Sequence, residues 1–351
     1  MKRIKFLAII SGIFLLFSVM SCSKKNETKQ AKATENGTKK GYVIGFSNNF
    51  NGNTWRHDME ELFKKQADQM IADGVLASYK ILEANKSTPT QISQIQSLIL
   101  DGVDGIIIDP ASSTALNGVI EKATEAGIPV LVIDNGPVTS DKCYQLNWDI
   151  ANGWARPATN YLVDRLNGKG NIIEIRGLPG TSLDDVFHKA VQEVITANPG
   201  MKIVGEVYGE WTATVAQKQV ASIISGIDHV DGVVGQGGDA YGAVQAFKAA
   251  GKDIPIVVGG NRGNFLNWWL AEKNKNGYET FSVCSNPGCA AAALYIITDI
   301  LDGVSVPKDM IMPTLEVTQD TIDSFKGIAE DDVASTVYDH EWVKKNCYVQ
   351  N

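Results

Sequence analysis

Short runs of β-branched residues alternate with longer amphipathic segments from Gly41 onward, and Gly, Asn, Asp or Pro joins them. Strands linked through helices form a parallel sheet with right-handed crossovers. Strands are predicted at 42–46, 78–82, 105–108, 130–133, 171–175, 203–207, 232–234, 256–258 and 281–283, and helices at 54–73, 89–100, 113–126, 151–166, 182–197, 212–225, 239–250 and 287–301. The pattern predicts an α/β protein.

A faint internal repeat suggests that the α/β body has two halves of similar plan. The residues VDGII at 103–107 return as VDGVV at 230–234, and AGIPV at 126–130 returns as AGKDIPI at 250–256. In each copy a helix stops at Gly and a Pro precedes a buried strand. Two doubly wound halves are the simplest explanation, and chance recurrence of a common helix-to-strand loop is the alternative.

The first forty residues differ in pattern from the rest. Lys2, Arg3 and Lys5 precede an apolar run at 6–20 that is short for a membrane span, and Cys22 follows directly after Ser21. This predicts an export signal at 1–21. It resembles the lipobox of bacterial lipoproteins, which implies that Cys22 carries a lipid anchor on the outer side of the membrane. A stop-transfer helix and a plain secretory signal are the alternatives. The polar residues at 22–40 are typical of a flexible tether.

Composition narrows the possible partners and chemistry. Hydrophobic residues make up 44% and charged residues 21% of the chain, as in globular proteins, and the net charge of −8 becomes −11 once the three cations of the signal are removed. No basic patch indicates nucleic-acid binding. The histidines and cysteines show no metal-ligand spacing, so neither a metal nor another cofactor is predicted. Cys284 and Cys289 could pair or remain as two buried thiols.

In an open parallel sheet, ligands bind beyond the carboxyl ends of the strands. The loops predicted there are rich in Asn, Asp, Gly, Ser and Trp, which suit hydroxyl recognition. Trp55 and Trp211 follow strands in different halves, so two indoles could face each other and cover the apolar faces of a sugar. Both could instead pack between helix and sheet. We assign Trp148, Trp154 and the pair at 268–269 to core or hinge packing.

Six segments of the body form a specific pattern by their order and spacing: IGFSNN at 44–49, GVDGIIIDP at 102–110, AGIPV at 126–130 through Asp134, GTS at 180–182, QGGD at 236–239 and VVGGN at 257–261. With these segments the body resembles, over about 42–318, the type I periplasmic sugar-binding proteins. This ribose- and galactose-binding group delivers ligands to ABC permeases. The resemblance implies an extracytoplasmic binding protein for a neutral monosaccharide, without a cofactor.

The resemblance also implies which residues contact the ligand. It points to Asn51, Trp55, Asp134, Trp211, Asn261 and Ser285, and the further candidates are Arg56, Asp109, Asn135 and Asp239. Three positions depart from the family pattern: Asn135 and Phe187 stand where arginines are usual, and Gly237–Gly238 replace an Asn-Asp pair. Loss of two guanidinium groups favours a ligand other than ribose or pyranose galactose. The Trp55-Arg56 pair resembles the subgroup that binds furanose sugars, although Arg56 could also be a solvated first-turn residue.

Such proteins close around their ligand by hinge motion. We expect three crossings between lobes, near 145–149, 284–286 and 312–314. The first lobe would hold 41–146 plus 286–312, and the second 147–285 plus 313–351.

Two other functions compete with transport. The residues GQGGDA at 235–240 match a dinucleotide-binding variant, but the motif is weak outside a first βαβ unit, and no nucleophile, phosphate-binding or metal motif accompanies it. We therefore do not expect an enzyme. The same body could serve as a sugar, polyol or quorum-signal sensor for a membrane kinase or chemoreceptor. The sequence does not separate sensing from transport.

Overall fold

The computed structural model describes residues 41–134, 136–336 and 338–349. The predicted signal peptide, the tether and Cys22 lie outside the described residues, and so does Asn135. Residues 40–351 form one compact unit. Among the described residues, no helix has the length and apolar character needed to cross a membrane.

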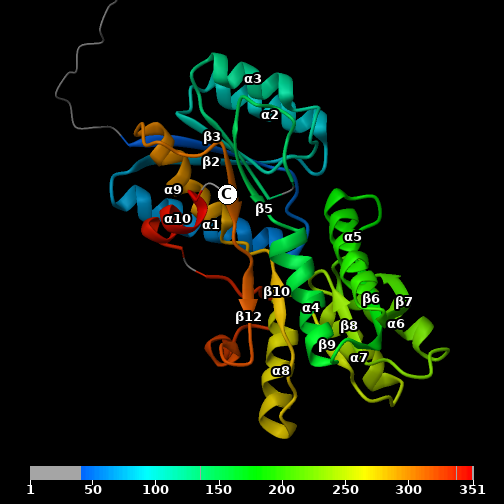
Figure 1. The fold of residues 1–351 in the computed structure, drawn as a ribbon. Coiled ribbons are helices and arrows are strands. Elements are labelled where there is room, and N and C mark those ends of the chain that lie inside the picture. Colours follow the sequence, from blue (N-terminus) through cyan, green and yellow to red (C-terminus); the bar gives the residue numbers. More distant parts are fainter. Residues whose placement is uncertain (1–40, 135, 337, 350–351) are drawn as a thin grey trace, which may run out of the picture. The chain divides into compact units, whose positions relative to one another are not determined.

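The first sheet has six parallel strands in the spatial order β11-β5-β4-β3-β1-β2. These are β1 (Tyr42–Asn48), β2 (Leu76–Glu83), β3 (Gly105–Ile108), β4 (Val130–Ile133), β5 (Tyr144–Trp148) and β11 (Asp309–Met312). On one face pack α1 (Thr54–Ala72), α9 (Cys289–Leu301) and α10 (His340–Cys347), and on the other α2 (Thr88–Leu100) and α3 (Asn117–Glu125) (Figure 1). Strands β3 and β4 are buried throughout, because helices cover both faces.

The second sheet repeats this plan with four parallel strands in the order β7-β6-β8-β9. These are β6 (Lys169–Arg176), β7 (Gly200–Tyr208), β8 (Gly232–Gly235) and β9 (Ile256–Val258). A π-helical turn (Ala151–Ala155), α4 (Arg156–Arg165) and α5 (Ser182–Ala197) cover one face, and α6 (Ala213–Ile224), α7 (Ala240–Ala249) and α8 (Gly263–Asn276) cover the other. The predicted fold class, α/β with doubly wound parallel sheets, is confirmed.

The internal repeat has a structural counterpart. The two VDG segments lead into β3 and β8, and each of these strands lies third in its sheet, in the matching orders β2-β1-β3-β4 and β7-β6-β8-β9. The repeat therefore marks equivalent positions in two similar halves.

A small antiparallel pair, β10 (Ser282–Cys284) with β12 (Leu315–Val317), lies where the chain passes between the halves. The chain leaves the first sheet after β5, returns between β10 and α9, and leaves again after β11. Strands β5, β11 and β12 and helices α8 and α10 are not among the predicted elements.

The expectation that 313–351 belongs wholly with the second half is wrong for its last part. Val343 and Cys347 of α10 are buried in the core of the first sheet, together with Tyr338 and the β11 residues Met310 and Met312. Earlier in the tail, Val317 and Ile322 pack in the core of the second sheet. The tail then returns to the first sheet, because burial of the apolar face of α10 there is favourable. Residues 329–334 still pair with the start of α8 and the loop before it, and the chain returns to the first core between Ala334 and Tyr338. The Val333 N–H donates to Asp58 Oδ2 of α1 at 3.1 Å.

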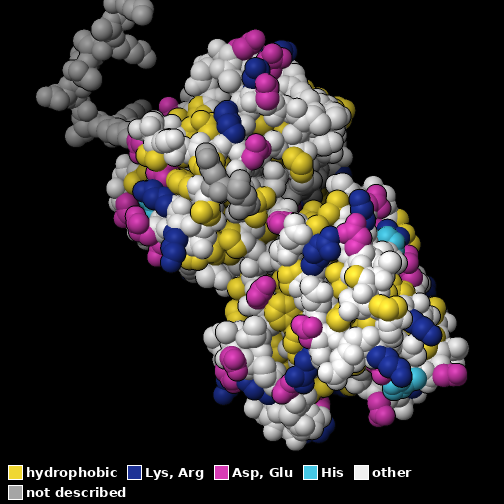
Figure 2. Space-filling model, viewed as in Figure 1, with side chains coloured by type: hydrophobic (Ala, Val, Ile, Leu, Met, Phe, Trp, Pro, Cys, Tyr) yellow, Lys and Arg dark blue, Asp and Glu magenta, His cyan; other side chains and the backbone are white. Residues whose placement is uncertain are grey.

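Charged side chains of both signs are interspersed on the face shown in Figure 2, with no large field of one sign. This distribution does not favour a polyanionic partner.

Four cysteines, Cys143, Cys284, Cys289 and Cys347, are free and buried among the described residues. Cys284 lies in the core of the second sheet and Cys289 in the core of the first, so the two do not pair. Burial raises the pKa of Cys143 to about 11 and that of Cys284 and Cys347 to about 12. These thiols are therefore protonated and shielded at neutral pH.

We predict that the chain from residue 23 onward, which keeps the compact unit and lacks Cys22, does not react with a thiol reagent at pH 8 while folded. Four thiols should react after unfolding in guanidinium without a reductant. Recovery of only two would contradict the free state of Cys284 and Cys289. The measurement is a thiol count by absorbance.

Candidate ligand-binding site

A cavity of about 520 Å³ lies beyond the carboxyl ends of strands from both large sheets. Its volume is in the range of small-molecule sites. The walls come from the loop before α1, the ends of β4, β7, β8 and β9, the π-helical turn, the segment after β10 and the tail at 331–333. Of the sequence-predicted site residues, Trp55, Arg56, Asp134, Trp211, Asn261 and Ser285 line this cavity. The structure therefore brings Trp55 and Trp211 to one site.

The wall from the first sheet is organised around Arg56. Asn53 caps α1 by accepting the Arg56 N–H at 2.8 Å, which fixes Arg56 in the first turn. Its guanidinium lies between two carboxylates, with Nη1 3.0 Å from Asp109 Oδ2 after β3 and Nη2 2.5 Å from Asp134 Oδ2 after β4. Trp148 Nε1 of β5 donates to Asp134 Oδ1 at 2.8 Å. One cation thus joins α1 to the ends of two strands.

The charges of this group depend on one another. Burial alone would lower the pKa of Arg56, but Asp109 and Asp134 outweigh it and the pKa is raised, so the guanidinium stays charged. Burial raises the pKa of Asp109 to about 7, and Arg56 opposes that rise. Asp109 is fully buried behind Arg56 and does not line the cavity, so its role is to hold Arg56.

The wall from the second sheet is organised around Trp211. Its Nε1 donates to Gln236 Oε1 at 3.1 Å, and Gln236 Nε2 donates to Asp184 Oδ1 at 2.7 Å. Arg176 at the end of β6 holds Asp184, with Nη2 2.6 Å from Oδ2. This chain of polar contacts fixes the plane of the indole. A Cβ at position 177 would lie 2.4 Å from Trp211 Nε1, so only glycine leaves room for the ring there.

Backbone strain gathers at the same cavity. Asp134, Glu210 and Trp211 have φ of 64°, 52° and 56°, in the left-handed region that residues with a Cβ rarely adopt. Each such conformation costs about 1–3 kcal/mol and is retained where the surrounding structure dictates it. All three residues line the cavity. Three of the six described non-glycine residues with left-handed φ thus line this cavity, whereas Asn85, Lys86 and Asn167 do not.

Trp55 and Ser285 join the two walls at the crossing segment. Trp55 Nε1 donates to the carbonyl of Ser285 at 3.3 Å, and the Trp55 ring lies 5.0 Å from the Arg56 guanidinium carbon. Ser285 follows β10, where the chain returns to the first sheet. The Trp55 ring is thereby held between α1 and the segment that joins β10 to α9, with the Arg56 guanidinium over the ring.

Three predicted residues are engaged in internal contacts. Asn51 Nδ2 donates to Glu60 Oε2 at 2.7 Å, and Asn51 does not line the cavity. Asn261 donates to the Leu315 carbonyl at 2.8 Å and accepts from Ser282 Oγ at 2.6 Å, so both ends of its amide have protein partners. Asp239 is buried beneath the loop after β8 and does not line the cavity either.

The loop after β8 argues against dinucleotide binding. Asp239 accepts the N–H groups of Gly237 and Gln236 at 3.0 and 3.4 Å. These are amides that a dinucleotide-binding loop would present to a pyrophosphate. A carboxylate already takes them here, and the cavity beyond is lined by Trp211 and Gly238.

Sequence reasoning missed several lining residues. Trp154 packs in the core as predicted, edge-on against the buried Phe187 at 5.8 Å, and it also lines the cavity from the π-helical turn. Arg262, Asp331 and Val333 line it because the tail folds back, with Arg262 Nη1 donating to the Asp331 carbonyl at 3.0 Å. The π-helical turn could not be read from the sequence, since it continues the apolar periodicity of α4.

The described residues hold one group that could bind a metal ion, Glu174, His188 and Glu206, and it does not line the cavity. The sequence predicted no metal site. These residues are spread over two strands and a helix, so no sequence spacing marks them.

The chain matches the profile of a family described as periplasmic binding protein domain over residues 44–305. This match covers most of the chain, so the chain belongs to that family, which confirms the resemblance drawn from the sequence. The family implies a location outside the cytoplasm.

Individual proteins similar to this chain are consistent with this family assignment. The xylitol-binding protein of Mycolicibacterium smegmatis is 30% identical over 243 residues, 68% of each chain. The crystal structure of an ABC transporter solute binding protein from Thermobispora bispora has a TM-score of 0.76 at 34% identity and covers 87% of this chain and 94% of that one. Other relatives are named as ribose, galactofuranose and D-apiose binding proteins. These relatives are binding proteins rather than enzymes, as predicted for this chain.

One structural neighbour serves a different system. The fructose binding periplasmic domain of the hybrid two component system BT1754 has a TM-score of 0.66 at 26% identity and covers 81% of this chain and 93% of that one.

We predict that Arg56→Met lowers the free energy of unfolding by about 3–5 kcal/mol, because it leaves the buried Asp109 carboxylate and the nearly buried Asp134 without their cation. The measurement is denaturant unfolding at pH 7.5. Arg156→Met is the matched control, since the Arg156–Glu193 pair is exposed and contributes at most about 1 kcal/mol. Equal losses in the two variants would contradict the assignment.

Proposed function

We propose that the protein captures a neutral monosaccharide, in a pyranose or furanose form, and delivers it to an ABC permease. The observation that carries the proposal is that Trp55 and Trp211, from different halves of the chain, line one cavity with Asp134 and Arg56. The relatives named for ribose, galactofuranose, apiose and xylitol support a small polyhydroxylated ligand.

The cavity chemistry favours an uncharged ligand. Indole rings cover the C–H faces of a sugar, and Asp134 and Arg56 offer an acceptor and donors for its hydroxyls. Arg56 is already balanced by two carboxylates, so it holds no surplus charge for an anionic ligand. A cationic ligand would have to compete with Arg56 for Asp134.

We infer that the ligand is gripped by hinge closure of two lobes. In this proposal 41–146 and 286–312 form the first lobe, joined by α10, and 147–285 with 313–334 form the second. A ligand that touches Trp55 on one lobe and Trp211 on the other stabilises the closed form by its higher affinity for it. Of the predicted contacts, we retain Trp55, Arg56, Asp134, Trp211 and Ser285 as the ligand-binding set, with Asp109 as a positioning residue.

We further propose that Cys22 is lipidated and anchors the protein outside the cytoplasm. The basic and apolar segments before Cys22 and the polar tract after it support this assignment. An anchored binding protein stays close to a permease in the same membrane, which raises its effective concentration there.

We predict that one or more neutral sugars raise the thermal midpoint of the chain from residue 23 onward, in a panel of pentoses, hexoses, furanose-forming sugars and polyols. Ligand at a hundredfold over Kd adds about 2.7 kcal/mol of stability, which a thermal shift detects. Trp211→Ala should weaken binding at least tenfold, since it removes one face of the site. Binding of the same sugar should be measured by calorimetry.

Trp342→Ala is the control, because Trp342 lies on α10 outside the cavity. It should leave the affinity within about twofold. A response to amino acids or nucleotides alone would overturn the carbohydrate proposal, and so would a sugar that binds Trp211→Ala as tightly as the native chain.

Sensing is the second candidate, favoured by the similarity to the periplasmic domain of a hybrid two component system. In that case the closed form would signal to a membrane kinase or chemoreceptor instead of releasing its ligand to a permease. The ligand site would be unchanged. Only the partner of the closed form differs.

We predict that cells lacking the protein lose most uptake of the radiolabelled sugar at low concentration, because delivery to the permease depends on capture. Expression of the native chain should restore uptake, and expression of Trp211→Ala should not. Normal uptake with loss of a sugar-dependent transcriptional response would support sensing instead and contradict the transport proposal.

A further inference from the structure

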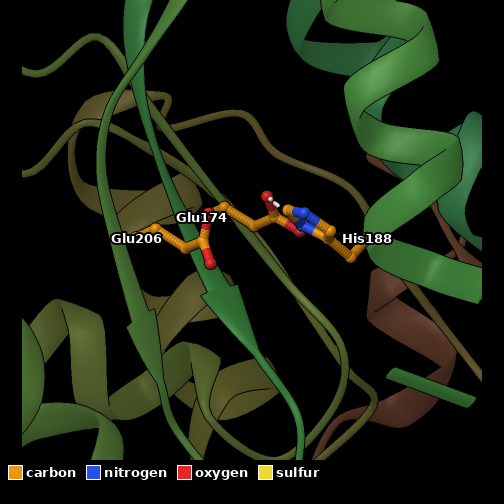
Figure 3. A group of neighbouring side chains, drawn as sticks. All are labelled: Glu174, His188 and Glu206. Carbon is orange, nitrogen blue, oxygen red and sulfur yellow. Dashed lines mark hydrogen bonds and ion pairs between the residues drawn. The ribbon is translucent and has the colours of Figure 1, made fainter. Parts of the chain in front are cut away.

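Three side chains that could ligate a metal meet on the face of the second sheet covered by α5. Glu174 of β6 and Glu206 of β7 are in register on neighbouring parallel strands, and His188 of α5 lies above Glu174 (Figure 3). One ligand atom from each residue can be chosen so that all three atoms lie within 4.8 Å of one another. The three residues do not line the ligand cavity, so they are free of the proposed sugar site.

Among the described residues, no lysine or arginine forms an ion pair with the buried Glu174 carboxyl, although the charge of Arg176 opposes the rise in its pKa. Glu174 is fully buried, and its two oxygens lie 2.9 and 3.0 Å from His188 Nδ1, with Gln192 Nε2 at 3.5 Å. Neither imidazole nor amide carries a fixed charge at neutral pH, and Glu206 places a second carboxylate on the adjacent strand. Burial raises the pKa of Glu174 to about 7, with His188 opposing the rise.

Arg176 forms an ion pair with Glu206 and would therefore compete with a metal ion for it. Arg176 also has two other carboxylate partners, so it can lose Glu206 and remain paired. Its Nη1 lies 3.1 Å from Glu206 Oε1, while Nη2 lies 2.6 Å from the buried Asp184 and 3.6 Å from Asp185. If Glu206 turned toward a cation, Arg176 would keep two carboxylate partners. Glu206 is exposed, so this rotation meets no packed core.

We propose that Glu174, His188 and Glu206 bind one divalent zinc ion. An imidazole nitrogen with two carboxylate oxygens suits Zn²⁺, whereas Ca²⁺ and Mg²⁺ prefer oxygen ligands alone. Three protein ligands leave a fourth position for water. Gln192, one turn after His188 on α5, would orient the Glu174 carboxylate from behind.

The ion would join α5 to β6 and β7 and would lie between Glu174 and His188 in place of their hydrogen bond. Binding requires His188 Nδ1 without its proton and Glu174 as carboxylate, so protons compete with the metal. A ligand that binds only the folded chain raises the thermal midpoint. Zinc should therefore stabilise the second half of the protein independently of any sugar.

The test is a calorimetric titration of Zn²⁺ into the chain from residue 23 onward at pH 7.5, in a buffer that does not bind the metal. We expect one ion per chain and a higher thermal midpoint with zinc. Glu206→Gln and His188→Ala should each weaken binding at least tenfold, since even loss of a supporting group costs about 10–100-fold. The native chain should bind zinc more weakly at pH 5.5 than at pH 7.5, because protons compete with the metal for the ligands.

His229→Ala is the matched control, because His229 Nε2 also pairs with a carboxylate, Asp231 at 2.8 Å, but belongs to no such group of three among the described residues. It should bind zinc as the native chain does. Absence of saturable binding to the native chain would overturn the proposal, and so would equal affinity in Glu206→Gln or His188→Ala. Unfolding without metal checks that each variant folds, and Glu206→Gln alters only an exposed side chain. Sugar binding by the native chain is scored separately, so the two proposals can fail independently.

Discussion

The site depends on a buried cation held between two carboxylates. Arg56 can occupy its place only because β3 and β4 are neighbours in a parallel sheet, so that Asp109 and Asp134 follow strands that end at the same edge. The N-terminal turn of α1 brings the guanidinium to that edge. Removal of the Arg56 charge would leave the two carboxylates buried without compensation, and removal of the carboxylates would do the same to Arg56. The ion pairs therefore hold α1, the ends of β3 and β4 and the cavity wall together.

The wall from the second half is fixed by a hydrogen-bonded chain that ends in an ion pair. Trp211 stands on strained backbone, and its indole is oriented by Gln236, which Asp184 and Arg176 hold in turn. A pre-oriented ring loses little freedom when a ligand binds, which favours affinity. The two walls thus combine a charged group from one sheet with a fixed aromatic surface from the other.

The sequence was enough to predict the fold class, the nine strands other than β5, β11 and β12, and the loops that form the cavity. Apolar periodicity reports burial, and the ends of parallel strands are where loops converge. The hydrogen-bond partners of individual side chains were harder to predict. Asn261 follows its strand as expected, yet its amide bonds Leu315 and Ser282, which are distant in sequence. Asp109 proved to be a buried support for the same reason, since its partner Arg56 is distant in sequence. Asp239 instead bonds the N–H groups of Gln236 and Gly237 beside it, and its burial was not evident from the sequence. The return of α10 to the first sheet depends on which core has room for Val343 and Cys347, and local sequence does not encode that.

We propose that an uncharged sugar lies between the two tryptophans with its hydroxyls bonded to the Arg56–Asp134 pair. A crystal structure of the protein with the sugar selected by thermal shift tests it most directly. We expect the rings of Trp55 and Trp211 against opposite faces of the sugar, with Asp134 and Arg56 within about 3.2 Å of hydroxyl oxygens. A ligand bound away from both indoles, or a charged ligand that displaces Asp134 from Arg56, would contradict it.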